Sequence, residues 1–131
     1  WPVPGGDSYA ARLFEDAGAR YLWHDRGGTG SIFLDLESVL ARAGDADYWF
    51  NFNYGRRTRS AVGEADPRLT RFAPYRTGRM YHYYARVRPW GASDYWESGA
   101  AHPERILADI ISILHPEILP EHELFYYRRL E

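Results

Sequence analysis

Apolar residues recur every three or four positions in three segments of the chain, at residues 9–17, 36–43 and 103–114. This spacing places the apolar side chains on one face and predicts three amphipathic helices. Residues that favour the ends of helices flank each segment. The expected boundary residues are Asp7 or Ser8 and Gly18 for the first helix, Asp35 and Gly44 for the second, and Pro103 and His115 for the third.

Short runs of apolar and aromatic residues between these helices predict strands. The expected strands lie near residues 2–4, 20–23, 48–51, 79–84 and 124–129. The pair Asp66-Pro67 predicts a further short helix that runs to Phe72. Strands that alternate with helices in this way indicate an α/β layer with a mostly parallel sheet.

The chain has 131 residues, a net charge of −2 and no cysteine. The length predicts one domain, residues 1–131. Because nucleic-acid binding needs a concentrated basic face, the balanced charge argues against a nucleic-acid partner. The lack of cysteine excludes disulfides and thiolate metal sites. All 16 basic residues are arginine, which excludes Schiff-base chemistry at lysine and the P-loop lysine.

A glycine-rich loop, Gly27-Gly28-Thr29-Gly30, follows a predicted strand at the place of a dinucleotide-binding fingerprint. The match is incomplete because Phe33 occupies the position of the third glycine. A surface loop, or a loop that faces a ligand, explains these glycines better than nucleotide binding does.

The segment Gly6-Asp7-Ser8-Tyr9-Ala10 is similar to a nucleophile elbow with alanine in the last place. A serine hydrolase would use Ser8 with an acid such as Asp47 and a base such as His82, whereas a helix cap explains the same serine without catalysis. None of the five histidines falls at a metal-binding spacing. We therefore expect no catalytic residue, no bound metal and no intrinsic cofactor, and a serine hydrolase is the alternative.

Aromatic residues are numerous: 22 of the 131 residues are Trp, Tyr or Phe. Many of them adjoin Gly, Pro or Asn instead of lying in apolar runs, so we expect part of them to line a surface. A carbohydrate-binding module uses such a surface, and so does the binding lobe of a larger protein.

Five blocks, spread over nearly the whole chain, carry a family resemblance. They are Pro4-Gly5-Gly6-Asp7-Ser8-Tyr9, Leu34-Asp35-Leu36-Glu37-Ser38-Val39-Leu40, Ala46-Asp47-Tyr48-Trp49, Gly78-Arg79-Met80-Tyr81 and Leu114-His115-Pro116-Glu117. Together they resemble the C-terminal lobe of the periplasmic substrate-binding proteins that serve importers of iron–siderophore complexes, haem and vitamin B12. The resemblance implies a three-layer Rossmann-like lobe, in which helices flank a mostly parallel central sheet, and an N-terminal lobe elsewhere in the same protein.

The resemblance also implies a ligand between the two lobes, at the carboxyl ends of the strands. The candidate ligand-binding residues in the loops expected there are Tyr9, Trp23, Asn53, Tyr54, Arg86, Trp90, Tyr95 and Trp96. Aromatic walls and cations suit an iron–siderophore complex, and haem or a corrinoid is the next expectation. Because a siderophore already ligates its iron, no metal ligand is expected from the protein. We expect Tyr54, Tyr95 and Trp96 to be partly exposed on one edge of the sheet.

In the family that this chain resembles, a glutamate near the start of a helix in each lobe pairs with arginines of the membrane permease. Glu37 matches that position, within Leu36-Glu37-Ser38-Val39-Leu40. The positive end of the helix dipole favours a negative charge there, and the apolar neighbours turn the carboxylate outward. The resemblance thus implies docking on an ABC importer's permease, with the protein in the periplasm or on the outer face of the cytoplasmic membrane.

Overall fold

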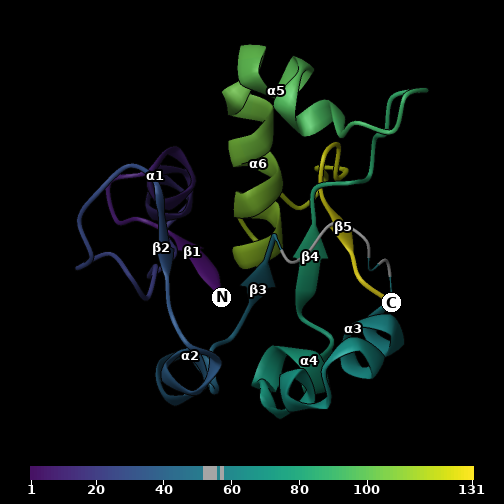
Figure 1. Ribbon diagram of the computed structural model, residues 1–131. Coiled ribbons are helices and arrows are strands. Elements are labelled where there is room, and N and C mark those ends of the chain that lie inside the picture. Colours follow the sequence, from purple (N-terminus) through teal and green to yellow (C-terminus); the bar gives the residue numbers. More distant parts are fainter. Residues whose placement is uncertain (52–55, 57) are drawn as a thin grey trace.

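The computed structural model describes residues 1–51, 56 and 58–131 (Figure 1). The described residues form short strands, six α-helices and two 3-10 helices. The order along the chain is β1 (Pro2–Pro4), α1 (Tyr9–Asp16), β2 (Ser31–Phe33), α2 (Leu36–Ala43), β3 (Trp49–Phe50), α3 (Arg59–Ala65), η1 (Pro67–Arg71), α4 (Ala73–Thr77), β4 (Met80–His82), η2 (Asp94–Trp96), α5 (Ser98–Ala101), α6 (Pro103–Leu114) and β5 (Arg128–Arg129).

The strands form two small sheets. In one, β1 pairs antiparallel with β2, so that Val3 lies opposite Ile32. In the other, β4 lies between β5, which is antiparallel to it, and β3, which is parallel, with Trp49 opposite Met80. Within the described part of the chain, β3 and β4 are the one parallel pair. The predicted three-layer Rossmann-like lobe with a mostly parallel central sheet is therefore wrong.

The difference begins at residues 20–23, where a strand was expected: residues 20 and 21 are irregular, and residues 22–25 form a turn. The amides of His24 and Arg26 donate hydrogen bonds to the carbonyl groups of Tyr21 and Trp23, at 3.2 and 3.0 Å, and the chain reverses there. It then forms β2, where no strand was predicted, and runs back along β1. Parallel pairing needs a crossover connection, whereas a reversal yields an antiparallel pair.

The predicted helix caps are confirmed. The hydroxyl of Ser8 accepts a hydrogen bond from the Ala11 amide at 3.1 Å, and the Asp35 carboxylate accepts one from the Ser38 amide at 2.8 Å. Gly18 follows α1 in the left-handed conformation, with φ of 81°. The third predicted helix is α6, with the predicted bounds.

The helices α3 and α4 were not expected from the sequence. Thr58 caps α3 and accepts a hydrogen bond from the Ala61 amide at 3.1 Å. Each of the two helices buries a single side chain, Val62 in α3 and Pro74 in α4. One buried residue leaves no repeat of apolar positions, so periodicity could not reveal them.

Two glycine-rich loops pair through their backbones next to the β1–β2 sheet. The amide of Gly5 donates to the Gly30 carbonyl at 2.8 Å, and the amide of Asp7 donates to the Gly28 carbonyl at 3.1 Å. The Asp7 carboxylate accepts a hydrogen bond from the Gly28 amide at 3.0 Å. A Cβ atom on Gly5 would lie 2.3 Å from the Gly28 carbonyl oxygen, so glycine is required for this approach.

The main core lies where α1 and α6 meet the β3–β5 sheet. It includes Leu13 and Phe14 of α1, Ile106 and Ile110 of α6, and Tyr126 beside β5. A second core joins β1, α2 and the turn at residues 22–25. A cavity of about 1300 Å³ has residues of β1, α2 and β3 among those that line it. The two cores thus hold the β3–β5 sheet and the β1–β2 sheet on separate sides of this space.

A buried carboxylate on α6 holds the C-terminal segment. Asp109 has no exposed surface. Its carboxylate accepts hydrogen bonds from the amides of Phe125, Tyr126 and Tyr127, at 3.0, 2.7 and 2.9 Å. Nε2 of His122 lies 2.7 Å from the same carboxylate. Asp109 therefore fixes the backbone of residues 125–127, just before β5.

Candidate functional site

The candidate ligand site lies where the parallel strands β3 and β4 end. Asn51 follows β3 and adopts a left-handed conformation, with φ of 60°. Tyr83 follows β4, and Tyr127 precedes β5, which runs antiparallel to β4. The Tyr127 hydroxyl donates a hydrogen bond to Oδ1 of Asn51 at 3.0 Å. Ligands of α/β sheets commonly bind beyond the carboxyl ends of parallel strands, which makes this edge the place to look.

Four aromatic side chains gather at this edge, and we call Tyr83, Tyr95, Trp96 and Tyr127 the aromatic edge cluster. The rings of Tyr83 and Tyr95 stack with centroids 4.7 Å apart. Trp96 meets Tyr95 edge to face at 4.9 Å, and Tyr127 meets Tyr95 in the same manner at 6.0 Å. Offset and edge-to-face contacts of this kind add to the stability that burial gives.

Polar contacts hold η2, which carries Tyr95 and Trp96, against β4. The Ser93 hydroxyl donates to the Tyr83 carbonyl and accepts from the Tyr95 amide. The Ser98 hydroxyl donates to the Asp94 carboxylate at 2.7 Å and lowers the pKa of Asp94 below its usual value. The position of Trp96 is thereby set by hydrogen bonds at both ends of η2.

The cluster has a buried floor and an exposed rim. Tyr95 and Tyr127 are 3% and 1% exposed, and burial raises the pKa of both phenols above the usual value. Tyr9, at the start of α1, lies close enough to raise the pKa of Tyr95 further. On the rim, Trp96 is 61% exposed and Tyr9 is 49% exposed. The rim offers flat apolar surface, and the buried phenols of the floor support it, with the Tyr127 hydroxyl already bonded to Asn51.

The structure brings together three of the predicted ligand-binding residues: Tyr9, Tyr95 and Trp96. The predicted exposure of Trp96 is confirmed, but that of Tyr95 is wrong, because Tyr83, Trp96 and Tyr127 cover its ring. The sequence reasoning failed there since it judged Tyr95 by its small polar neighbours in the chain.

The other predicted ligand-binding residues lie elsewhere. Trp23 is buried in the second core, 6.2 Å from the Tyr21 ring, because the expected strand before it is a turn. Arg86 and Trp90 lie in the segment between β4 and η2, and both are exposed. Asn53 and Tyr54 lie outside the described residues.

Sequence reasoning missed two members of the cluster, Tyr83 and Tyr127, because both fell inside predicted strands. Their place at the strand ends was the available signal, since side chains at the carboxyl end of a strand reach the ligand edge. Ser8 is 6% exposed and its hydroxyl caps α1, which favours the helix-cap interpretation over catalysis. Among the described residues, no group of three His, Asp or Glu side chains is placed to bind a metal ion.

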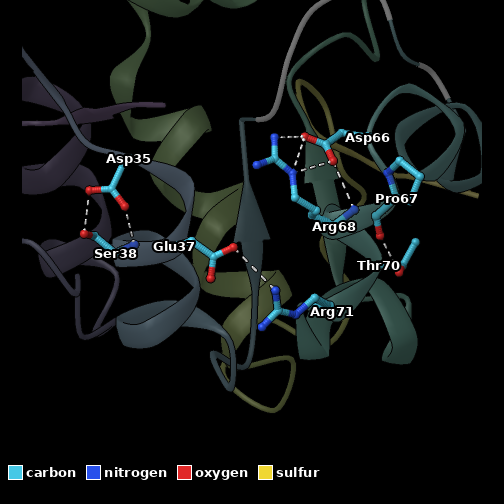
Figure 2. Close-up of polar contacts among 8 residues, drawn as sticks. All are labelled: Asp35, Glu37, Ser38, Asp66, Pro67, Arg68, Thr70 and Arg71. Carbon is cyan, nitrogen blue, oxygen red and sulfur yellow. Dashed lines mark hydrogen bonds and ion pairs between the residues drawn. The ribbon is translucent and has the colours of Figure 1, made fainter.

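A second candidate surface lies at the start of α2 (Figure 2). In Figure 1, α2 and α4 lie at one end of the β3–β5 sheet and α5 at the other, so this surface is remote from η2 and the aromatic edge cluster. Glu37 lies in the first turn of α2, and its side chain is 67% exposed. Its outward orientation confirms the prediction. Oε1 of Glu37 lies 3.6 Å from Nη1 of Arg71, which ends η1.

Hydrogen bonds fix the segment that carries Arg71, as Figure 2 shows. Asp66 caps η1 by accepting from the Arg68 amide at 3.0 Å, and its carboxylate also pairs with the Arg68 guanidinium at 2.8 Å. The Arg68 side chain lowers the pKa of Asp66 below its usual value. The Thr70 hydroxyl donates to the Pro67 carbonyl at 2.7 Å. Glu37 at the capped start of α2 thus meets Arg71 at the last residue of η1, and a shallow pocket of about 270 Å³ lies beside them.

Each helix in the described part of the chain is too short or too polar to cross a membrane. No known protein family and no solved structure matches this sequence. An uncharacterized lipoprotein of Methanocaldococcus jannaschii is 29% identical to it over 116 residues, which cover 88% of this chain and 26% of the relative. The chain therefore spans about a quarter of the length of that relative.

Proposed function

We propose that this chain is the ligand-binding C-terminal lobe of an ABC importer's substrate-binding protein, with an iron–siderophore complex as its first-choice ligand. The aromatic edge cluster carries the proposal: the exposed Trp96 ring stands on the buried rings of Tyr95 and Tyr127 at the carboxyl end of a parallel strand pair, and Tyr9 lies near Tyr95. Such a surface suits a large chelate with apolar faces. Haem and a corrinoid are the next ligands on the same grounds.

The sequence resemblance and the relative support the remainder of this proposal. The relative is a lipoprotein and is about four times as long as the region it shares with this chain. We infer a lipid-anchored protein outside the cytoplasmic membrane, in the periplasm or on the membrane's outer face, with an N-terminal lobe elsewhere in the protein. We propose the role of a binding protein, and the helix cap formed by Ser8 counts against the serine hydrolase.

The ligand site is tested in the full-length protein that contains this lobe. Ferrichrome, haem and cobalamin are titrated separately, and tryptophan fluorescence reports binding. Trp96→Ala is expected to weaken binding of the recognised compound about tenfold, which corresponds to about 1.4 kcal/mol. Phe33→Ala is the matched control, because Phe33 is 78% exposed on β2, away from the cluster. No binding of any of the three compounds, or equal losses in both variants, would contradict the proposal.

The docking surface is tested by Glu37→Arg in the same full-length protein. Exposed ion pairs contribute little to stability, so the Glu37 carboxylate is free to exchange Arg71 for an arginine of the permease. A charged residue at the rim of a protein–protein interface mainly affects the rate of association and the alignment of the two partners. Transporter-dependent uptake is therefore expected to fall by about tenfold or more while ligand affinity stays within about twofold.

The matched control is Glu104→Arg, because Glu104 is an exposed glutamate in the first turn of another helix, α6. Uptake by this variant should stay normal. If Glu104→Arg impairs uptake as much as Glu37→Arg does, or if Glu37→Arg abolishes ligand binding, Glu37 is not a specific docking residue.

A carbohydrate-binding module is the second candidate function. The observation that favours it is the exposure of two tryptophans, Trp90 and Trp96, at 69% and 61%. Exposed indole rings stack on sugar rings through their apolar faces. The same fluorescence titration with neutral oligosaccharides separates the two functions: binding of a sugar, with no response to the three metal compounds, would favour the module. Labelling of Ser8 by a fluorophosphonate would instead indicate the serine hydrolase.

A further inference from the structure

Residues 86–93 form an arm that projects from the body of the protein between β4 and η2 (Figure 1). Two hydrogen bonds join its sides. The Asp94 amide donates to the Arg86 carbonyl at 2.9 Å, and the Arg88 amide donates to the Ala92 carbonyl at 2.8 Å. Val87 and Ser93 form an antiparallel bridge between them. The segment, which we call the Trp90 arm, is thus a paired hairpin with defined ends.

A tight turn places Trp90 at the tip of the arm. The Gly91 amide donates to the Arg88 carbonyl at 2.8 Å and closes the turn Arg88-Pro89-Trp90-Gly91. Proline suits the second position of such a turn, and Gly91 supplies the left-handed conformation at the fourth, with φ of 90°. Trp90 is 69% exposed and makes no ring contact with the described residues. The indole is therefore held outward by a rigid turn.

Ion pairs fix the arm to the body. Nη2 of Arg88 lies 2.8 Å from Oδ1 of Asp94, and its Nε lies 3.0 Å from Oε2 of Glu97. These ion pairs offset the charge of both acidic residues at the base of the arm, although Arg88 Nε makes no hydrogen bond. They leave the exposed part of the arm with apolar side chains and a different arginine, Arg86.

Two arginines beside the base form no ion pair with a carboxylate of the described residues, although Arg86 contributes to the lowered pKa of Asp94 and Arg105 to that of Glu104. The guanidinium of Arg86 lies 3.8 Å above the Phe125 ring centroid, and that of Arg105 lies 5.1 Å from the same centroid. Both arginines are exposed. An exposed indole with guanidinium groups behind it matches a lipid interface, where tryptophan lies at the headgroup level and arginine contacts phosphate.

We propose that the Trp90 arm inserts its indole into the interfacial layer of a phospholipid bilayer, with Arg86 and Arg105 against the lipid phosphates. We choose a membrane as the partner for the following reason. A four-residue turn presents one large side chain, whose surface is far smaller than the roughly 800 Å² that each partner buries in a stable protein interface. A weak contact of this kind is useful to a protein that an anchor already holds at the membrane. That last point rests on the proposed function, whereas the lipid contact itself does not.

The test uses this 131-residue chain and two kinds of vesicle, pure phosphatidylcholine and a 3:1 mixture of phosphatidylcholine and phosphatidylglycerol. Sedimentation measures the bound fraction, and bromine-labelled lipid reports indole depth by quenching. Trp90→Ala is expected to lower the partition coefficient at least fivefold on both vesicles and to remove most of the quenching. Arg86→Gln is expected to weaken binding to the anionic vesicles alone, by about fivefold.

Phe33→Ala is the control, since Phe33 is an exposed aromatic side chain on β2, outside the arm. It should bind vesicles like the unaltered chain. Equal binding by the Trp90→Ala variant, or no binding to either vesicle at 1 mM lipid (a concentration of about that order suits a single inserted indole), would overturn the proposal. Self-association that disappears in Trp90→Ala, measured by sedimentation velocity without lipid, would overturn it in favour of a second copy. Vesicles contain neither chelate nor permease, so this result is independent of the proposed importer function.

Discussion

The carboxylates of Asp109 and Glu37 have opposite surroundings, although both belong to helices. Asp109 has no exposed surface, and three backbone amides and a histidine approach it. Glu37 is largely exposed, and its ion pair among the described residues is with the guanidinium group of Arg71, at 3.6 Å. The Asp109 carboxylate holds the backbone of residues 125–127, whereas the Glu37 carboxylate remains accessible to a partner. The difference separates the residues that specify the fold from those that can serve a partner.

The largest expected effect is that of Asp109→Ala. Removal of this carboxylate leaves the buried amides of Tyr126 and Tyr127, and the part-buried amide of Phe125, without their acceptor. Each unsatisfied buried group costs about 1–3 kcal/mol, so we expect a loss of about 4 kcal/mol in the free energy of unfolding. Urea denaturation measures it. Glu104→Ala on the same helix is the control, with a change within about 0.5 kcal/mol; similar losses in both variants would contradict the distinction drawn above.

Alkaline pH gives the next largest effect. Burial raises the pKa of Tyr95 and Tyr127 above the usual value. Below pH of about 10 these phenols are protonated in the folded and the unfolded chain, and stability does not depend on them. Above it, the unfolded chain releases their protons and the folded chain does not, so stability falls by about 1 kcal/mol per tyrosine between pH of about 10 and about 11.

Tyr127→Phe isolates one of these phenols. Between pH 9 and 11, the variant should lose about 1.4 kcal/mol less stability than the unaltered chain, as urea unfolding at the two pH values would show. At pH 7 it should be about 1 kcal/mol less stable, because Asn51 loses the hydrogen bond from the Tyr127 hydroxyl. An identical alkaline loss in both proteins would mean that Tyr127 ionises freely in the folded state.

The smallest expected effect is that of Arg71→Gln. The Arg71 and Glu37 side chains are 59% and 67% exposed, and an exposed pair of this kind contributes less than about 0.5 kcal/mol. The unfolding midpoint in urea should therefore barely move, and added salt should not change the comparison. A loss above about 1 kcal/mol would show that the pair holds α2 to η1, and Glu37 would no longer be a carboxylate free for a partner.

Local features of the fold could be predicted from the sequence, and long-range pairing could not. The caps at Ser8 and Asp35 and the bounds of α6 follow from short-range chemistry, and all three are confirmed. The sheet arrangement is not local. Turns at residues 20–26 replaced an expected strand, and the three-residue β2 leaves too little pattern to detect. An α/β alternation was therefore extended to a parallel sheet that the structure does not have.

The candidate site could also be predicted only in part, because some of its contacts are local and others are long-range. Glu37 could be placed outward because the helix cap and the apolar neighbours fix its orientation. Trp96 was correctly expected on the surface, but Tyr95 beside it is covered by rings that come from β4 and from the segment before β5. Polarity of neighbours along the chain gives no information about side chains that arrive from elsewhere in the sequence.

The paired loops of Gly5 and Gly6 have a consequence for how sequences of this kind can diverge. A Cβ atom on Gly6 would lie 2.5 Å from the His24 carbonyl oxygen, and one on Gly5 would lie 2.3 Å from that of Gly28. No rotamer change relieves a clash with a backbone oxygen, so a single substitution at either glycine requires the opposite loop to move. Evolutionary change in these two loops is therefore coupled: relatives that lose either glycine should also differ in the length or path of residues 24–30.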